Sequence, residues 1–440
     1  MTVREWKASE ELLRLFQSVG RASLLYDIQD SHSGNMAVKI RDASGAEEVV
    51  ITATGSQKGD LDAGQICFLS ATETDYGYYK ASSETDIHQR ILALPGAGAS
   101  MHAHTKELTI VTLDDRPKPG PVPDFVPVDP LGWAYLGGRI PVDWFAVPSG
   151  SAEMTELIPR RLAGHPATIV QNHGTFVRAR TLPEAFFLLC VANTAGQVVR
   201  QAQQLRVDVG GLRTSIEADP GSHFPLWPGP YEVGGDGVCE FPEEAELLTE
   251  FRRAGARVFE SKLSPFHTGS MSVRGVQDIL YAPKASMPRE VGGPLRRLPL
   301  APDPSDSAEL AFHKTLYAET DFQTAMHAWL PEAEAQAHFR YPGEGEALDR
   351  IIPLDAEGGF LYLVIPVLPP DVDEETLIRK LYDYKVAVVR GGGVWAVGTQ
   401  SLSEVLHHPS SLREICLYRL GAFERGLDLR AMEPKKARRW

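Results

Sequence analysis

The chain has few cysteines and no long uninterrupted apolar stretch, and each shortage excludes a class of protein. Only four cysteines occur among 440 residues, and none forms a C-x-x-C pair, so neither a thiolate zinc site nor a disulfide framework is predicted. We expect reduced, mostly buried thiols. No apolar run reaches the roughly 18–20 residues that a membrane-spanning helix needs, so no membrane partner is expected. The cysteines are Cys67, Cys190, Cys239 and Cys416.

Acidic residues outnumber basic ones, 58 to 44. The net charge of −14 at pH 7 argues against a nucleic-acid partner. The N-terminal residues MTVREWKASEELLRLF mix charged with apolar side chains and lack a small-residue cleavage site, which predicts an amphipathic helix rather than a signal peptide. We therefore expect a cytoplasmic protein. With 43% hydrophobic and 23% charged residues, the chain has the composition of a globular protein, and its length predicts two or three domains.

The two halves of the chain resemble each other in four windows that keep the same order. One pair of windows, SHSGNMAVKI and FHTGSMSVRG, shares His, Gly, Met and Val in place. Another pair preserves a Glu–x3–His–x13–His spacing without a gap. Such ordered self-similarity predicts a tandem duplication. The paired windows are 10–20 with 244–255, 31–40 with 266–275, 84–104 with 309–329, and 167–179 with 386–398.

A segment rich in Gly and Pro separates the halves. Residues 207–236 show no sustained period, which predicts a linker or an ordered irregular arm. We place the first domain at 1–212, the arm at 213–237 and the second domain at 238–440. Helix and strand patterns alternate around Gly turns in both domains, which predicts a layered α/β fold. The expected helices are 9–20, 85–94, 183–205, 243–256 and 309–319, and the expected strands are 36–40, 48–52, 100–104, 168–172, 361–367 and 386–389.

Three histidines of the first half predict a metal site. His102 and His104 are two residues apart in a strand pattern, and residues i and i+2 of a strand project from one face, so both rings can reach one ion. This pair would supply two of the four ligands of a tetrahedral zinc site. His173 follows an apolar strand at a Gly turn, where a side chain can be presented at a sheet edge. The alternative for the pair is ordinary surface or core histidines.

Other polar residues lie close to these motifs in the sequence. Glu84 opens a helix pattern after two serines, where backbone N–H groups and the helix dipole favour anions; the alternative is an ordinary helix-start carboxylate. His88, one turn later, is expected to pack or to support the site rather than to bind the metal. Thr105 is expected to cap a helix that begins TKELTIV.

These motifs resemble the class II aldolase/adducin family, which includes fuculose-1-phosphate and ribulose-phosphate enzymes. The resemblance covers roughly residues 8–205, where SGNMAV, ITATGSQKGDL, KASSETDIH, SMHAHT and VQNHGTF occur in the order of the family. It implies a three-layer α/β/α domain with a mixed, mostly antiparallel central sheet. The second half matches the same pattern more weakly, so we expect two such domains.

The same resemblance implies a site and a cofactor. A divalent metal ion, zinc first and Mn2+, Co2+ or Fe2+ otherwise, would be held by His102, His104 and His173, with Glu84 in the acid/base position. Short polar residues and an open glycine would bind a substrate phosphate, or a carboxylate with the same donors. Each of these residues taken singly could equally serve a turn or a cap. They are Asn35, Thr54, Gly55, Ser82 and Ser83.

The implied reaction follows from charge. A small hydroxy-carbonyl substrate, a sugar or sugar phosphate, would bind the metal, which stabilises an enediolate as a carbon–carbon bond breaks, while Glu84 moves the proton. We therefore expect a metal-dependent carbon–carbon lyase of aldolase type. The same site could serve decarboxylation, dehydration, epimerisation or iron-dependent oxidation. A non-catalytic, adducin-like interaction protein is the remaining alternative.

The second half has lost most of this site. It keeps Glu309 and His327, but Trp329 stands in place of the second ligand and three glycines, 391–393, replace the third. Because three protein ligands are the norm for catalytic zinc, this half is expected to be degenerate. Fourfold rings are common in the family, so the resemblance implies a homo-oligomer, a dimer that supplies four units. The second half could then complete the pocket of the first through Trp329, Trp395 or Tyr382.

Overall fold

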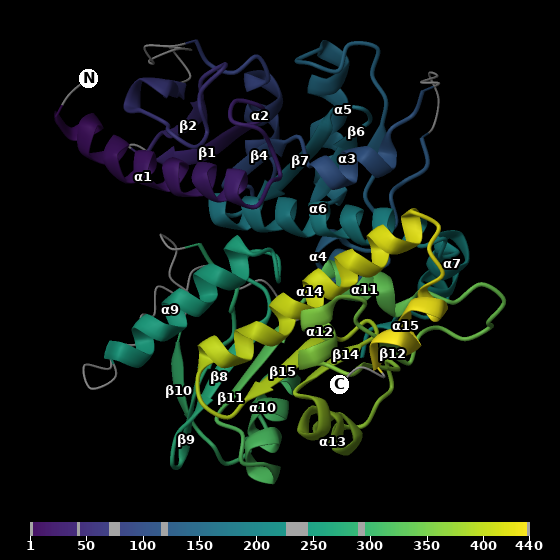
Figure 1. Ribbon diagram of the computed structural model, residues 1–440. Helices are drawn as coiled ribbons and strands as arrows, with labels where there is room; N and C mark the ends of the chain where they lie inside the picture. The colour runs from purple at the N-terminus through teal and green to yellow at the C-terminus, as the bar shows by residue number, and fades with distance from the viewer. Residues whose placement is uncertain are drawn as a thin grey trace. The chain divides into compact units, whose positions relative to one another are not determined.

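The chain folds into two compact units in the computed structural model, which describes residues 3–41, 45–69, 80–115, 122–225, 245–288 and 295–437 (Figure 1). Contacts assign most residues up to 196 to the first unit and most residues from 197 onward to the second. The predicted domain boundaries stay predictions. The described part of the predicted arm is helical instead of irregular, with α7 at Val209–Ala218 and α8 at Pro220–His223.

The first unit contains a seven-stranded sheet in the order β3-β2-β1-β4-β7-β6-β5. Every neighbouring pair is antiparallel except β5 and β6, which are parallel. The sheet therefore places β4 at its centre, between β1 and β7. The strands are β1 (Asn35–Arg41), β2 (Glu47–Thr52), β3 (Ile66–Leu69), β4 (Ala99–Ala103), β5 (Val142–Asp143), β6 (Ala167–Val170) and β7 (Gly174–Ala179).

Helices cover both faces of this sheet. Figure 1 shows α2 and α5 above the strands and α1 and α6 below them. On one side, apolar residues of α2 and α5 pack with Val170 of β6 and Phe176 of β7. The helices are α1 (Val3–Leu25), α2 (Thr85–Leu92), α3 (Lys106–Thr112), α4 (Pro130–Leu136), α5 (Ala152–Gly164) and α6 (Leu182–Gln204), with a short 3-10 turn at Ala63–Gln65.

Helix α6 is long and apolar enough to cross a membrane by length and composition. However, 83% of the relevant stretch is buried inside the structure, as is normal for a core helix. At its start, the Thr181 hydroxyl accepts a hydrogen bond from the Glu184 backbone N–H and caps the helix. We therefore treat α6 as part of the protein core.

The second unit contains an eight-stranded sheet in the order β10-β9-β8-β11-β15-β14-β13-β12. Its first seven strands repeat the order of the first sheet, and its single parallel pair, β13 and β14, occupies the place of β5 and β6. A duplication would produce this correspondence; the duplication itself stays a prediction. The strands are β8 (Ser270–Arg274), β9 (Asp278–Ala282), β10 (Arg296–Pro299), β11 (Thr324–Ala328), β12 (Arg350–Ile351), β13 (Ile365–Leu368), β14 (Val386–Val389) and β15 (Gly393–Gly398).

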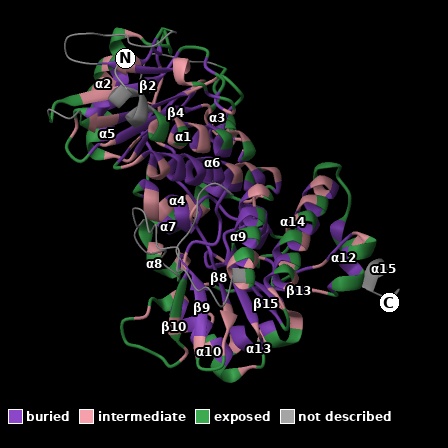
Figure 2. Cartoon of the chain, turned by 90° about the vertical axis from the view of Figure 1, so that its left-hand side faces the viewer, coloured by how far each residue is buried: buried purple, intermediate pink, exposed green. Residues whose placement is uncertain are grey.

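Both faces of the second sheet are buried. In β14, Val386 and Val388 belong to one apolar cluster and Ala387 and Val389 to another, because successive side chains of a strand point to opposite faces. Figure 2 shows the strands as mostly buried, with exposed residues concentrated on the surrounding helices and loops. The predicted three-layer α/β arrangement with mixed, mostly antiparallel sheets is confirmed. The helices are α9 (Ala245–Glu260), α10 (Ala308–Glu319), α11 (Pro331–Ala337), α12 (Ala356–Leu361), α13 (Glu374–Tyr384), α14 (Leu402–Glu424) and α15 (Leu429–Ala437).

The strand predicted at 361–367 is wrong over its first half. Helix α12 ends at Leu361, and β13 begins only at Ile365. The Asp355 carboxylate accepts a hydrogen bond from the Gly358 backbone N–H and starts this short helix, a local cap that the apolar run conceals. Among the cysteines, Cys67, Cys190 and Cys416 are buried as expected, and Cys239 lies outside the described residues.

Candidate metal centre

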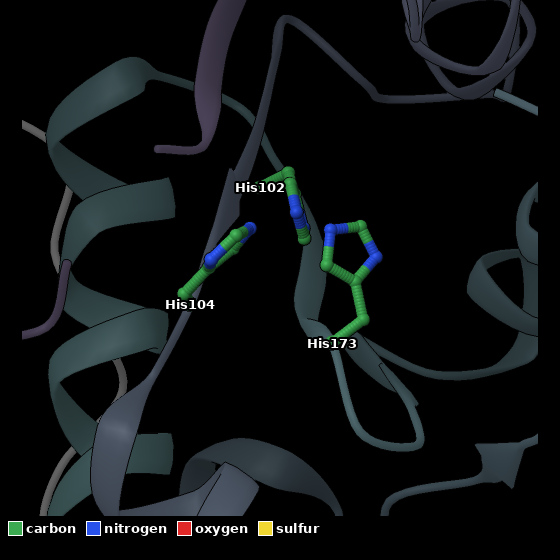
Figure 3. Close-up of side chains that lie close together, drawn as sticks. All are labelled: His102, His104 and His173. Atoms are coloured by element: carbon green, nitrogen blue, oxygen red, sulfur yellow. The ribbon is translucent and has the colours of Figure 1, made fainter. Parts of the chain in front are cut away.

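The structure brings the three predicted histidines together in the first unit. His102 lies on β4, His104 directly follows that strand, and His173 lies in the turn between β6 and β7. One ligand atom of each residue lies within 4.8 Å of those of the other two. The ring centroids are 5.2 Å apart for His102 and His104, and 4.7 Å apart for each pair that includes His173. Figure 3 shows the rings facing one common space.

The neighbouring strand fixes the orientation of His102. Its ring stacks on Phe176, its cross-strand partner on β7, with centroids 4.0 Å apart. Its Nδ1 lies 3.1 Å from the carbonyl oxygen of Thr175 and donates a proton to it. This hydrogen bond leaves the Nε2 lone pair free, which is how a backbone carbonyl usually prepares a metal-binding histidine.

A tight turn presents the third histidine. Asn172 adopts a left-handed backbone conformation with φ of 61°, and the His173 N–H bonds to the carbonyl of Val170. The Asn172 side chain secures the turn through two hydrogen bonds of 3.1 Å to the backbone of Asp114. Asparagine tolerates this conformation better than most residues, so the sequence QNHG forms the turn that the site needs.

The histidine nitrogens have the properties that a divalent ion requires. Within the described part of the chain, His102 Nε2 and His173 Nδ1 are buried and have no hydrogen-bond partner. Burial lowers the pKa of all three histidines, that of His173 to about 4, so the rings are neutral at pH 7. Neutral imidazoles with unused buried lone pairs fit a metal ion, because binding removes the cost of leaving them unpaired.

Gly174 holds β7 close to the histidines, and this closeness gives a prediction. A Cβ at this position would lie 2.5 Å from the carbonyl oxygen of Ala103 and 2.9 Å from Cε1 of His102. We expect Gly174→Ala to destabilise the chain by about 1–3 kcal/mol and to weaken zinc binding at least about 10-fold. Urea unfolding and competition with a chelating dye would measure both effects. Gly164→Ala is the control, since a Cβ there meets nothing within 4 Å; equal behaviour of the two variants would contradict the prediction.

Glu84 is a buried carboxylate beside the histidines rather than an ordinary helix-start residue. It occupies the N-cap position of α2, but its side chain makes no capping hydrogen bond. Its Oε2 lies 4.0 Å from His102 Nε2 and accepts a 2.7 Å hydrogen bond from Asn35 Nδ2. Burial raises the pKa of Glu84 to about 6, although the bond from Asn35 acts in the opposite direction. Such a group can accept or release a proton near neutral pH.

The predicted anion-binding residues lie on two adjoining segments. A bridge between Ala53 and Ala81 sets the segment of Thr54 and Gly55 beside that of Ser82 and Ser83. Asn35 Nδ2 donates to Ser82 Oγ at 3.1 Å and so links the segments to Glu84. Gly55 has a φ of 68° and open space at its Cβ position, which leaves room for a ligand. Their role in binding an anion stays a prediction.

The predicted capping role of Thr105 is wrong, because its side chain makes no capping hydrogen bond. Thr105 occupies the N-cap position of α3, but its hydroxyl bonds to Thr175 Oγ1 at 2.7 Å rather than to the helix backbone. His88 is buried with both ring nitrogens engaged, by Ser100 Oγ and Asn35 Oδ1, so it supports the site and is not available as a ligand. The stacking role of Phe176 was missed, although the alternating pattern GTFVRA could have placed it on the face of the histidines.

In the second unit, the histidine at the corresponding site is already engaged by a carboxylate and a backbone carbonyl. His327 Nδ1 lies 2.6 Å from Glu309 Oε1, and its Nε2 lies 2.9 Å from the carbonyl oxygen of Gly392, so neither nitrogen is available for a metal. Among the described residues of this unit, no group of His, Cys, Asp or Glu has the geometry of a metal site. Trp395 stacks on His327 and is fully buried, so the suggestion that it completes a neighbouring pocket is wrong.

Comparison with known proteins agrees with this geometry. Residues 14–199 match the family described as Class II Aldolase and Adducin N-terminal domain. The first unit therefore resembles the class II aldolase and adducin family. It is 30% identical over 158 residues to the 5-methylthioribulose-1-phosphate/5-deoxyribulose-1-phosphate aldolase of Rhodospirillum rubrum. That match covers 36% of this chain and 65% of the relative, so the chain spans less than two thirds of the relative's length.

Two solved structures of aldolases match a similar share of the chain. The l-fuculose-1-phosphate aldolase of Thermus thermophilus is 22% identical, with a TM-score of 0.37, over 43% of this chain and 92% of that one. The sugar-phosphate aldolase of Thermotoga maritima is 20% identical, with a TM-score of 0.38, over 44% of this chain and 96% of that one.

Proposed function

We propose that the chain is a metal-dependent carbon–carbon lyase of aldolase type that acts on a small hydroxy-carbonyl compound, a sugar phosphate. The observation that carries the proposal is the group of three histidines whose ligand atoms lie within 4.8 Å of one another, beside the buried carboxylate of Glu84. The 30% identical relative, named as an aldolase of ribulose phosphates, supports the substrate class.

His102, His104 and His173 would hold the ion. We propose Zn2+, since three neutral imidazoles suit zinc and leave a position open for substrate. Mn2+, Co2+ and Fe2+ are the alternatives, and metal analysis would distinguish them from zinc. When bound, a divalent ion supplies a Lewis acid for the negative charge that develops on the substrate oxygens as the bond breaks.

Glu84 would transfer the proton. Its Oε2 lies 4.0 Å from His102 Nε2 and accepts a hydrogen bond from Asn35, so the carboxylate has a fixed position beside the histidines. A pKa of about 6 lets it act as a base when ionised and as an acid when protonated near neutral pH. Asn35, Thr54, Gly55, Ser82 and Ser83 would bind the phosphate through side-chain and backbone donors.

Turnover of a substrate panel by the zinc-loaded full chain tests the proposal. We expect cleavage of ketose 1-phosphates into two smaller carbonyl compounds, and loss of this activity after dialysis against a chelator. Unphosphorylated analogues should show kcat/KM values at least about 100-fold lower, because each hydrogen bond to a charged group contributes about 1.5–3 kcal/mol. Release of CO2, formation of an epimer or oxidised product, or no turnover of any substrate would contradict the aldolase assignment.

The assembly and location of the protein are also proposals. We propose a homo-oligomer in which two chains supply four units, and a cytoplasmic enzyme of carbohydrate metabolism. The second unit would then have a structural role, because the histidine that it retains is already engaged by Glu309 and by the Gly392 carbonyl.

A further inference from the structure

A continuous set of hydrogen bonds runs from the core of the first unit to the candidate active site. Ser100 Oγ lies 2.9 Å from His88 Nδ1, and His88 Nε2 contacts Asn35 Oδ1. Asn35 Nδ2 then donates to Glu84 Oε2 at 2.7 Å. Asn35 is also the cross-strand partner of His102. Asn35, which lies opposite the proposed metal ligand His102, thus connects the buried residues Ser100 and His88 with Glu84.

Hydrogen-bond chemistry fixes the direction of this set. An ionised Glu84 can only accept, so the Asn35 amide must turn its Nδ2 toward Glu84 and its Oδ1 toward His88. His88 must then donate from Nε2. Because burial lowers the pKa of His88 to about 3, the ring carries one proton only, and its Nδ1 lone pair faces the Ser100 hydroxyl. That hydroxyl also lies 3.1 Å from the carbonyl oxygen of Val177, so the two acceptors share its proton. From His88 onward, each member therefore donates to the next, through Asn35 to Glu84.

In the second unit, a serine occupies the place of Asn35 in the corresponding set of hydrogen bonds. Ser270 replaces Asn35, donates to Glu309 Oε1 at 2.6 Å and lies 2.8 Å from His313 Nε2. His313 Nδ1 lies 2.7 Å from Ser272 Oγ. A hydroxyl rotates to suit its neighbours and needs no orientation from outside. An amide, in contrast, has an acceptor oxygen and a donor nitrogen. A flipped Asn35 amide would bring its Oδ1 next to the Glu84 carboxylate, where both groups can only accept.

We propose that His88 is a positioning residue that, through Asn35, fixes the carboxylate of Glu84 beside the three histidines. This inference rests on the proposed function for its effect on rate. By donating at Nε2, His88 allows only one orientation of the Asn35 amide. That orientation holds Glu84 Oε2 on the side of His102, where the proton must be transferred.

Steady-state kinetics of His88→Phe in the zinc-loaded full chain tests this role. Phenylalanine keeps the ring and its packing on Phe176 but cannot donate to Asn35. We expect kcat to fall about 10–100-fold while KM changes less than about 3-fold and zinc content is unchanged, the size of effect seen when groups supporting a metal site are removed. His88→Gln, whose amide can donate to Asn35, should recover most of the rate.

A double variant tests whether His88 acts through Asn35. Asn35→Ala should lower kcat by itself, and adding His88→Phe should then lower it by no more than about 2-fold, because coupled residues are not additive. Losses that multiply in the double variant would overturn the proposal. So would an unchanged kcat for His88→Phe, or a kcat for His88→Gln as low as that for His88→Phe.

The second unit offers a matched control for simple loss of stability. His313→Phe removes equivalent buried hydrogen bonds of α10, so it should lower the melting temperature but leave kcat unchanged. If His88→Phe does not fold, Ser100→Ala replaces it, since it removes the hydroxyl that lies between His88 Nδ1 and the carbonyl oxygen of Val177. We expect a loss of kcat of a few-fold at constant KM, and an unchanged kcat would overturn the proposal.

A crystal structure separates failure of this proposal from failure of the proposed function. Should the wild-type chain turn over no substrate, the aldolase assignment fails, but His88→Phe, or Ser100→Ala if that variant does not fold, can still be examined. In the variant we expect the contact between Asn35 Nδ2 and Glu84 Oε2 to be lost. An Asn35 amide and a Glu84 carboxylate that keep their wild-type positions would overturn the positioning role.

Discussion

His104→Ala is expected to leave the chain folded but to reduce its zinc content from about one ion per chain to nearly none. Three protein ligands are the norm for catalytic zinc, and two imidazoles bind it far more weakly. Activity should fall by more than about 100-fold, because even groups that only support metal ligands change activity by about 10–100-fold. Metal analysis of the purified protein, together with kcat/KM on the cleaved substrate, measures both quantities.

The control for this variant is an exposed histidine far from any predicted ligand in the sequence. His407 lies on α14 and is exposed, so His407→Ala should keep both zinc and activity. Loss of the ion from His104→Ala with activity intact would show that the metal is not catalytic. Retention of a full equivalent of zinc would show that His104 is not a ligand.

Glu84→Gln is expected to reduce kcat by about 10²–10⁴-fold while zinc content stays the same. Glutamine keeps the size of the side chain and an oxygen that accepts from Asn35, but it cannot take up a proton. A loss confined to kcat would identify Glu84 as the group that moves the proton. Steady-state kinetics with a ketose 1-phosphate, compared with wild type, measures kcat.

The matching carboxylate of the second unit supplies the control. Glu309→Gln weakens the contact with His327 and should lower stability, but we expect it to leave the rate unchanged, because that unit is not proposed to carry out chemistry. Equal loss of rate in the two variants would contradict the assignment of catalysis to the first unit. A Glu84→Gln variant with wild-type kcat would remove Glu84 from the mechanism.

Sequence periodicity predicted the part of the site that a strand determines by itself. The two-residue spacing of His102 and His104 places both on one side of β4, as the structure shows. The approach of His173 depends on the pairing of β4 with β7 and on the left-handed turn at Asn172. No local pattern encodes that pairing, and the resemblance to a family of known fold supplied it.

Contacts between distant segments account for what the sequence did not predict. The stacking of Phe176 on His102 and the contact of His88 with Asn35 join residues far apart in the chain. The loss of the metal site in the second unit could be predicted only in part. Loss of two ligands was evident from the sequence. The contact between His327 and the Gly392 carbonyl was not, because every residue has a backbone carbonyl and the sequence does not single this one out.

Anomalous diffraction at the zinc absorption edge, from crystals of the zinc-loaded chain, tests the central claim most directly. We predict one strong peak per chain, within bonding distance of nitrogen atoms of His102, His104 and His173, with Glu84 next to it. A peak elsewhere in the molecule, or crystals of zinc-treated protein with no peak among these rings, would contradict the proposed metal centre.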